Sequence, residues 1–220
     1  MHWDGFSTFL LGSFISLITI INPPATLPIF SSVTNGMDAA AARRTATSAS
    51  LYSFCILVVS LFAGSLIMKA FGISYGAMRV AGGMVIGLLG HGMLYGKAEV
   101  SEVAKAQYGN PAFFPLALPG ITGPGSIAVV IGLATQIREI GHFAQEVTAY
   151  LAVLLAMAGV CVVEFLLLRS ARSVITRLGN TGIEVITRLS GFLLICVGVQ
   201  FVASGAQTLY ASLVQAAASQ

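Results

Sequence analysis

Two short stretches interrupt the apolar sequence of this 220-residue chain, Asn22-Pro23-Pro24 and Pro119-Gly120-Ile121-Thr122-Gly123-Pro124-Gly125. Each lies inside a long segment without charged residues, the first running from Gly5 to Met37 and the second from Ala106 to Ile137. Proline removes a backbone donor and glycine weakens a helix, so we expect a helix break at both places. Irregular backbone of this kind survives in a membrane only where protein buries it or where it lines a polar cavity.

The composition around these stretches excludes an ordinary soluble domain. Only 9% of the residues are charged and 56% are hydrophobic, whereas soluble domains carry about 25% charged residues. Lipid is therefore the expected solvent, and no basic stretch points to nucleic acid. A membrane-spanning helix needs about 20 apolar residues, and the charge-free segments predict six such helices. We expect an all-α membrane protein with helices at about 6–33, 46–68, 76–95, 112–137, 146–168 and 184–210.

The two halves of the chain resemble each other. Residues 21–30 align with residues 121–130, and residues 78–82 align with residues 187–191, each pair sharing a few identities. Each half would hold a broken helix, a plain helix and a helix that opens with arginine and then glycine.

This similarity predicts a 3+3 inverted-topology repeat. An odd number of spans turns the second copy upside down, so the copies would be related by an axis in the membrane plane. The expected units are 1–105 and 106–220, with discontinuous helices 1 and 4.

Glycines are frequent in the expected third helix, at Gly82, Gly83, Gly87 and Gly90. Gly83 and Gly87 have the small-xxx-small spacing that lets membrane helices approach closely. We expect this face to pack tightly against another helix.

Basic residues predict the orientation of the chain in the membrane. The connections after helices one, three and five carry seven of them: Arg43, Arg44, Lys97, Lys105, Arg169, Arg172 and Arg177. The connections after helices two and four carry only Lys69 and Arg138. Because cytoplasmic loops are rich in Lys and Arg, we expect a multi-pass bacterial inner-membrane protein with both termini in the periplasm.

The paired breaks are the expected substrate site. Where a helix breaks, one end presents amides with partial positive charge and the other presents carbonyls, a combination suited to a carboxylate and an ammonium group. The candidate substrate-binding residues are Asn22, Pro23, Pro24, Thr26, Thr122, Gly123, Pro124, Gly125 and Ser126. The alternative is that the breaks only kink packed helices and that the Ser and Thr hydroxyls bond carbonyls a turn earlier.

Three ionisable residues are candidates for coupling or gating: Arg79, Glu164 and Arg188. Each also has a structural interpretation. Either arginine can reach the membrane interface, and Arg188 lies four residues after Glu184, a spacing that favours an ion pair. Glu164 can pair with Arg169 near the end of its helix. His91, a titratable residue inside an expected span, is open to a pH-sensitive role or to simple hydrogen bonding.

Several strings resemble the MarC family of six-span inner-membrane proteins, whose members include small neutral amino acid transporters. They are Asn22-Pro23-Pro24-Ala25-Thr26-Leu27-Pro28-Ile29-Phe30, Gly72-Ile73-Ser74 with Arg79-Val80-Ala81-Gly82-Gly83, and Pro115 to Ile127 around the Gly-Pro-Gly motif. The resemblance covers nearly the whole chain. Ala25 stands where the family motif usually has glycine.

The resemblance implies a secondary transporter for glycine, alanine or serine. A channel or exporter for another small metabolite is the alternative, and an intramembrane enzyme using Glu164 or His91 is a third. No nucleotide-binding or catalytic motif and no metal-ligand spacing is present in the sequence, so we expect no enzyme, cofactor or metal beyond a coupling ion, H⁺ or Na⁺. The expected partners are the bilayer and a small zwitterion, with no nucleic acid; a homo-oligomer is compatible with the sequence.

Overall fold

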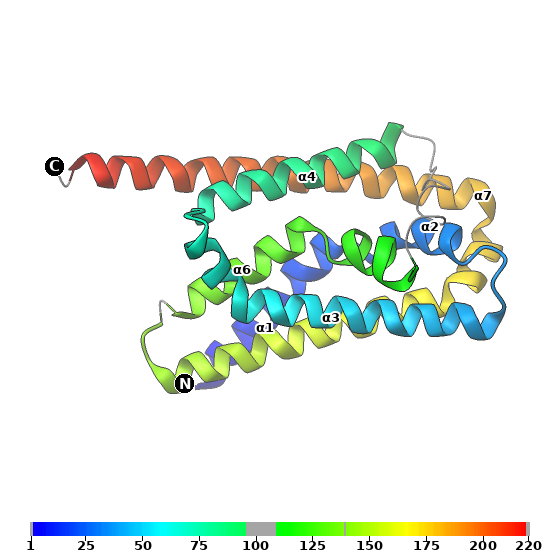
Figure 1. Ribbon diagram of the computed structural model, residues 1–220, viewed down its shortest axis with the longest axis horizontal. Coiled ribbons are helices and arrows are strands. Elements are labelled where there is room, and N and C mark those ends of the chain that lie inside the picture. Colours follow the sequence, from blue (N-terminus) through cyan, green and yellow to red (C-terminus); the bar gives the residue numbers. More distant parts are fainter. Residues whose placement is uncertain (1, 96–108, 139, 219–220) are drawn as a thin grey trace.

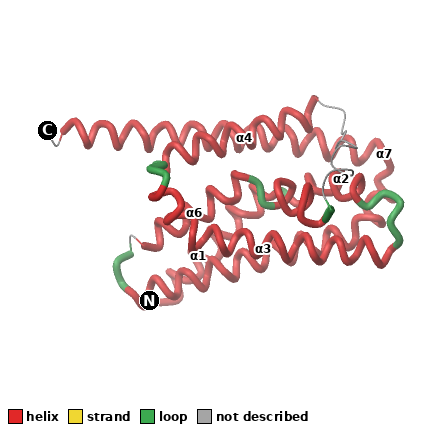
Figure 2. Tube along the Cα trace, in the orientation of Figure 1, coloured by secondary structure: helices red, strands yellow, loops and turns green. Residues whose placement is uncertain are grey.

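The computed structural model describes residues 2–95, 109–138 and 140–218, and its regular elements are helices throughout those ranges. In chain order they are α1 His2–Ile21, α2 Pro23–Val33, α3 Ala39–Ala70, α4 Tyr75–Tyr95, the π-helix η1 Ala112–Ile121, α6 Pro124–Arg138 and α7 Phe143–Ala218 (Figures 1 and 2). The expected boundary between residues 105 and 106, like Lys97 and Lys105, lies outside the described residues.

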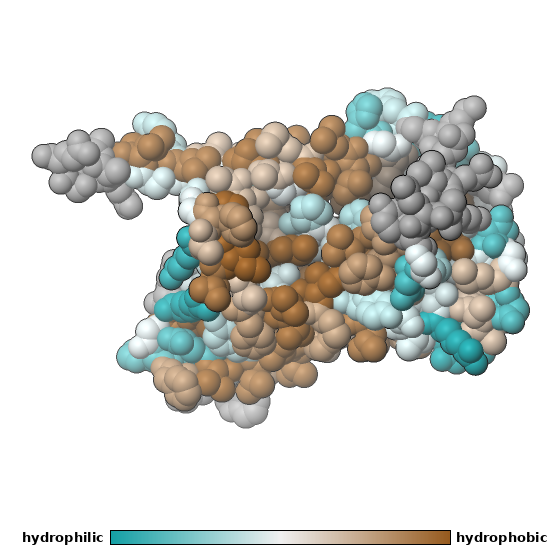
Figure 3. Space-filling model, in the orientation of Figure 1, coloured by the Kyte–Doolittle hydropathy of each residue, from teal (hydrophilic) through white to brown (hydrophobic). Residues whose placement is uncertain are grey.

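Four helical segments in the described part of the chain are long and apolar enough to cross a membrane: Ala39–Ala70, Tyr75–Tyr95, Phe143–Val174 and Thr181–Val214. Two bent pairs, Phe6–Ile21 with Pro23–Val33 and Ala112–Ile121 with Pro124–Arg138, bring the number to six if each pair is one span. On the visible face, hydrophobic residues gather mainly over the middle and hydrophilic residues toward the two ends (Figure 3). The all-helical membrane architecture is therefore confirmed, whereas the inverted repeat stays a prediction.

Two helices extend well beyond their expected bounds. Helix α3 begins at Ala39 rather than near residue 46, because the Asp38 side chain caps it by accepting a hydrogen bond from the Ala41 N–H at 2.6 Å. Helix α7 runs through the expected connection at 169–183, where only Gly179 leaves helical geometry. Gly179 has φ 65°, a conformation that glycine adopts readily, and it separates the two spanning segments of α7.

The region before the second break is more irregular than expected. Phe114 and Leu118 have extended backbone angles inside η1, at φ/ψ −123/129° and −130/120°. Each directly precedes a proline, Pro115 or Pro119, and a following proline disfavours the α-helical conformation. Pro115 was not among the expected breakers, so the irregular backbone at Phe114 was not predicted.

The broken helices lie between two pairs of straight helices. In Figure 1, α2, η1 and α6 lie between α3 with the first half of α7 on one side and α4 with the second half of α7 on the other. The turn after α2 and the bend between the two spanning segments of α7 lie at one end, and both termini lie at the other. The guanidinium of Arg172 donates to the Met37 carbonyl and so joins two of the basic connections. Which end faces the cytoplasm stays a prediction.

Helix α4 packs on the second half of α7 through glycines that recur every seven residues. The facing antiparallel pairs are Gly76 with Gly205, Gly83 with Gly198, and Gly90 with Gly191. A Cβ atom at Gly83 would lie 2.6 Å from the Gly198 carbonyl oxygen, so the two backbones touch directly. This contact confirms the expected close packing of the glycine-rich helix.

The glycine contact gives a first prediction. We expect Gly83→Ala to destabilise the protein by about 2 kcal/mol relative to Gly87→Ala, because overpacking costs about 1–3 kcal/mol and neither backbone can move aside. Gly87→Ala is the matched control, since a Cβ there meets nothing within 4 Å and both variants gain the same helix propensity. Thermal unfolding of the purified protein in detergent measures the difference. Equal melting temperatures for the two variants would show that the helices are not in backbone contact.

Candidate functional site

A cavity of about 500 Å³ lies where the two helix breaks approach each other. The first break contributes Ile20, Ile21, Ala25, Pro28 and Ile29, and the second contributes Pro115, Pro119, Gly120, Ile121, Gly123, Pro124, Gly125 and Ser126. Helix α4 and the second half of α7 close the cavity with Ile86, Leu88, Leu89, Gly92, Met93, Thr187 and Leu194. Most of its wall is apolar.

The first break leaves carbonyl groups at the end of α1 without their usual donors. Pro24 has no N–H to offer the Ile20 carbonyl four residues earlier. The Ala25 N–H donates to the Asn22 carbonyl at 2.8 Å instead of to Ile21. Among the described residues no hydrogen bond reaches the Ile20 or Ile21 carbonyl. Since both residues line the cavity, this wall presents the negative end of a helix dipole.

Asn22 makes the first break possible. Its backbone is left-handed, with φ 48° and ψ 68°, a conformation in which asparagine is enriched among non-glycine residues. Its side chain makes no capping hydrogen bond to α2. Because Pro23 and Pro24 occupy the first two positions of α2 and have no N–H, this helix start has fewer free amides than usual.

The second break supplies those amides instead. Helix α6 begins at Pro124, and no backbone acceptor is found for the Gly125 and Ser126 N–H groups among the described residues. A Cβ at Gly125 would lie 2.1 Å from Ile86 Cδ1, so α4 packs directly on this helix start. Both residues line the cavity, which places the positive end of a helix dipole there.

The structure brings only part of the expected set into the cavity. Gly123, Pro124, Gly125 and Ser126 line it, whereas Asn22, Pro23, Pro24, Thr26 and Thr122 do not. Thr122 is fully buried, and its hydroxyl donates to the Ala117 carbonyl at 2.6 Å. The hydroxyl of Ser126 donates to the Gly123 carbonyl at 2.9 Å. Ile86 and Thr187 were not expected, and no sequence motif marks them.

Glu164 is tied to the first break rather than to a loop cation. Its side chain is 0% exposed, and Oε1 lies 2.5 Å from the Thr26 hydroxyl, while Oε2 has no partner. The expected ion pair with Arg169 is not formed, since Arg169 lies over the Phe165 ring at 5.9 Å. Glu164 of α7 thus contacts Thr26 of α2, and the two helices pack against each other.

The Thr26 hydroxyl has two oxygen neighbours and one hydrogen. It lies 2.7 Å from the Pro23 carbonyl and 2.5 Å from Glu164 Oε1. A single hydroxyl hydrogen serves only one acceptor. Both contacts are hydrogen bonds when Thr26 donates to Pro23 and a protonated Glu164 donates to Thr26. The arrangement therefore fits a neutral carboxylic acid, the form whose burial costs least.

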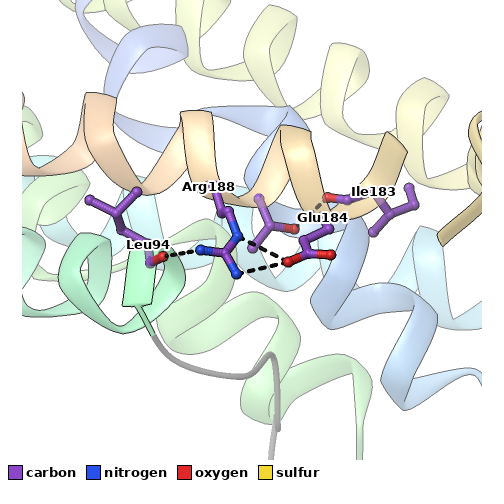
Figure 4. Close-up of polar contacts among 5 residues, drawn as sticks. Leu94, Ile183, Glu184 and Arg188 are labelled. Carbon is purple, nitrogen blue, oxygen red and sulfur yellow. Dashed lines mark hydrogen bonds and ion pairs between the residues drawn. The ribbon is translucent and has the colours of Figure 1, made fainter. Parts of the chain in front are cut away.

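The remaining candidates lie outside the cavity. Arg188 donates twice to Glu184 Oε1, at 3.0 and 2.8 Å, and once to the Leu94 carbonyl at 3.2 Å (Figure 4). It thereby satisfies an orphan carbonyl at the end of α4, and the i,i+4 pair that supports a structural interpretation of Arg188 is present. His91 is exposed and packs on the Tyr95 ring at 4.9 Å. Arg79 lines a different cavity, described below.

These features define a class: a polytopic α-helical membrane protein in which two bent helix pairs line one cavity. The chain belongs to the MarC family, whose description, MarC family integral membrane protein, it matches over residues 7–210. It is 36% identical to the inner membrane protein MarC of Salmonella typhimurium and to that of Escherichia coli. Each alignment spans 212 residues, 92% of this chain and 95% of the relative. No solved structure matches the chain. It is an inner-membrane protein with several spanning helices.

The buried pair gives a second prediction. Thr26→Val leaves the Glu164 carboxyl without any hydrogen-bond partner, and a buried polar group so orphaned costs about 1–3 kcal/mol. We therefore expect Thr26→Val to lower the melting temperature, while Thr26→Ser, which keeps the hydroxyl, does not. Adding Glu164→Leu to Thr26→Val should recover much of the loss, because both polar partners are then gone. If the double variant is no more stable than Thr26→Val, the pair is not energetically coupled.

Proposed function

We propose that this protein is a secondary transporter of small neutral amino acids of the glycine, alanine and serine class. In this proposal each bent helix pair is one discontinuous span of an inverted 3+3 repeat, and substrate binds between the two breaks. The observation that carries the proposal is the meeting of opposite helix ends in one cavity, carbonyls of Ile20 and Ile21 against amides of Gly125 and Ser126.

This arrangement complements a zwitterion. The α6 amides would donate hydrogen bonds to the substrate carboxylate, and the α1 carbonyls would accept hydrogen bonds from its ammonium group. None of the described residues that line the cavity is charged, so a ligand with net charge would find no counterion among them. The apolar walls from α4 and α7 favour a short aliphatic side chain. The lining of this cavity therefore supports a small, neutral, zwitterionic substrate.

Glu164 is the proposed coupling residue for a proton. It contacts Thr26 in the first turn of α2, so losing or gaining its proton would change the hydrogen bonding next to the first break. Arg188 is not part of this coupling proposal, because its ion pair and its bond to the end of α4 support a structural role. A sodium ion is the alternative coupling ion. If uptake depends on a sodium gradient and not on a proton gradient, Glu164 is not the coupling residue.

A channel or exporter for another small metabolite is the second candidate, because it would share the same cavity. Counterflow separates the two: a carrier accelerates exchange when unlabelled substrate fills the vesicle, and a channel does not. No observation favours the intramembrane enzyme, whose two candidate residues would have to face one cavity. Glu164 is buried against α2, whereas His91 is exposed beside Tyr95.

The third prediction tests the carbonyl end of the site. Pro24→Ala supplies an N–H that can bond the Ile20 carbonyl, and Pro24 itself does not line the cavity. We expect about a tenfold higher KM for glycine, alanine and serine, equivalent to about 1.4 kcal/mol, because the ammonium loses an acceptor. Uptake of labelled amino acids into proteoliposomes, under a proton or a sodium gradient, gives the measurement.

Pro111→Ala is the matched control, because it makes the same exchange before η1 and outside the cavity. It should leave the KM unchanged. The proposal fails if the folded wild-type protein moves none of these amino acids under either gradient. The assignment of the carbonyl wall fails if Pro24→Ala and Pro111→Ala have the same KM.

A further inference from the structure

A second cavity, of about 610 Å³, lies between α1, α4, α6 and the second half of α7. Thr8 is near the start of α1, Tyr75 begins α4 and Gln136 is near the end of α6, so the cavity lies toward the end that holds both termini. Its polar lining consists of Thr8, Ser13, Ser16, Thr19, Tyr75, Arg79, Gln136 and Gln200. Among the described residues that line the cavity, Arg79 is the only charged one and none is a carboxylate.

Arg79 has cation–π neighbours but no anion. Its guanidinium lies over the rings of Tyr75 and Phe201, at 5.4 Å from each centroid. Its Nε atom is buried without a hydrogen-bond acceptor, and no carboxylate among the described side chains lies within ion-pair distance. Arg188, at the corresponding place in the second half of the sequence, has both a carboxylate and a carbonyl. Arg79 therefore has donor capacity that the described residues leave unused.

A second polar atom in the same wall is also unsatisfied. The Ser13 side chain is 1% exposed, and its hydroxyl oxygen has no partner among the described residues. A buried polar group of this kind is costly unless a ligand or water satisfies it. Two buried donors without acceptors, Arg79 Nε and Ser13 Oγ, thus line one cavity with a net positive charge.

We infer that this cavity binds the carboxylate group of a small organic molecule. The planar guanidinium offers two parallel N–H donors that match the two carboxylate oxygens, and the rings on either side hold it in place. Recognition of phosphate groups usually relies on clusters of arginines, whereas this cavity has a single cation. The inference goes beyond the proposed transport site: Ile20 lies in the walls of both cavities, but this cavity selects negative charge and does not require transport.

Propionate and propionamide provide a matched pair of probes, because they have nearly the same size and shape and differ in charge. We expect propionate to raise the melting temperature of the detergent-purified full chain in a saturable way, and propionamide to have no effect. L-Alanine tests whether a zwitterion also supplies the carboxylate. Stabilisation of the wild-type protein by propionamide equal to that by propionate would overturn the inference.

Variants locate the binding. Arg79→Gln should raise the apparent Kd for propionate at least tenfold, Arg79→Lys should raise it less because the charge remains, and Ser13→Ala should raise it about threefold. Arg138→Gln is the matched control: it removes the same charge from an exposed position at the end of α6, outside the cavity, and should leave the Kd unchanged.

Two outcomes of the variant series would overturn the assignment. One is the same Kd for propionate in the wild-type protein, Arg79→Lys and Ser13→Ala. The other is an Arg79-dependent stabilisation by inorganic phosphate, or by phosphatidylglycerol micelles, that equals the effect of propionate, since the ligand would then be a phosphate group. Either result would overturn only the carboxylate assignment. The proposal of amino acid uptake through the other cavity is tested separately, by Pro24→Ala.

Discussion

Every backbone amide and carbonyl at membrane depth needs a hydrogen-bond partner, and the prolines at the two helix breaks leave a few of these groups without one. Pro24 cannot donate to the Ile20 carbonyl, and the start of α6 after Pro124 leaves the Gly125 and Ser126 amides without acceptors. The residues that carry these groups line a cavity to which α4 and the second half of α7 also contribute. The arrangement of the remaining helices around the breaks follows from this need.

Glycine is what lets the enclosing helices come close enough. The seven-residue spacing on α4 and α7 puts backbone against backbone at three levels, and Gly125 lets Ile86 of α4 lie directly on the start of α6. Because hydrophobic driving force between helices is weak in lipid, such close van der Waals contact carries much of the packing energy. The same helix pair then presents Ile86 and Thr187 to one cavity and Arg79 and Phe201 to the other.

Much of the fold could be predicted, because long segments without charged residues indicate membrane-spanning helices. The positions of the breakers at Asn22 and at Gly123 were equally visible, since proline and glycine act locally. The irregularity at Phe114 was missed, although Pro115 was there to signal it. Less of the site could be predicted: Gly125 and Ser126 do line the cavity, but Thr26 and Thr122 turn their hydroxyls to other partners.

The sequence by itself determined the solvent of this protein, its helices, its two breaks and its MarC-family membership, because each depends on composition or on residues close together along the chain. Only the tertiary structure decided what the ionisable residues do. Arg79 and Arg188 occupy similar sequence contexts, yet one faces a cavity without an anion and the other holds Glu184 and the end of α4. Glu164 meets Thr26 across 138 positions of sequence. The partner of a side chain is set by helix rotation and packing, which local sequence does not encode.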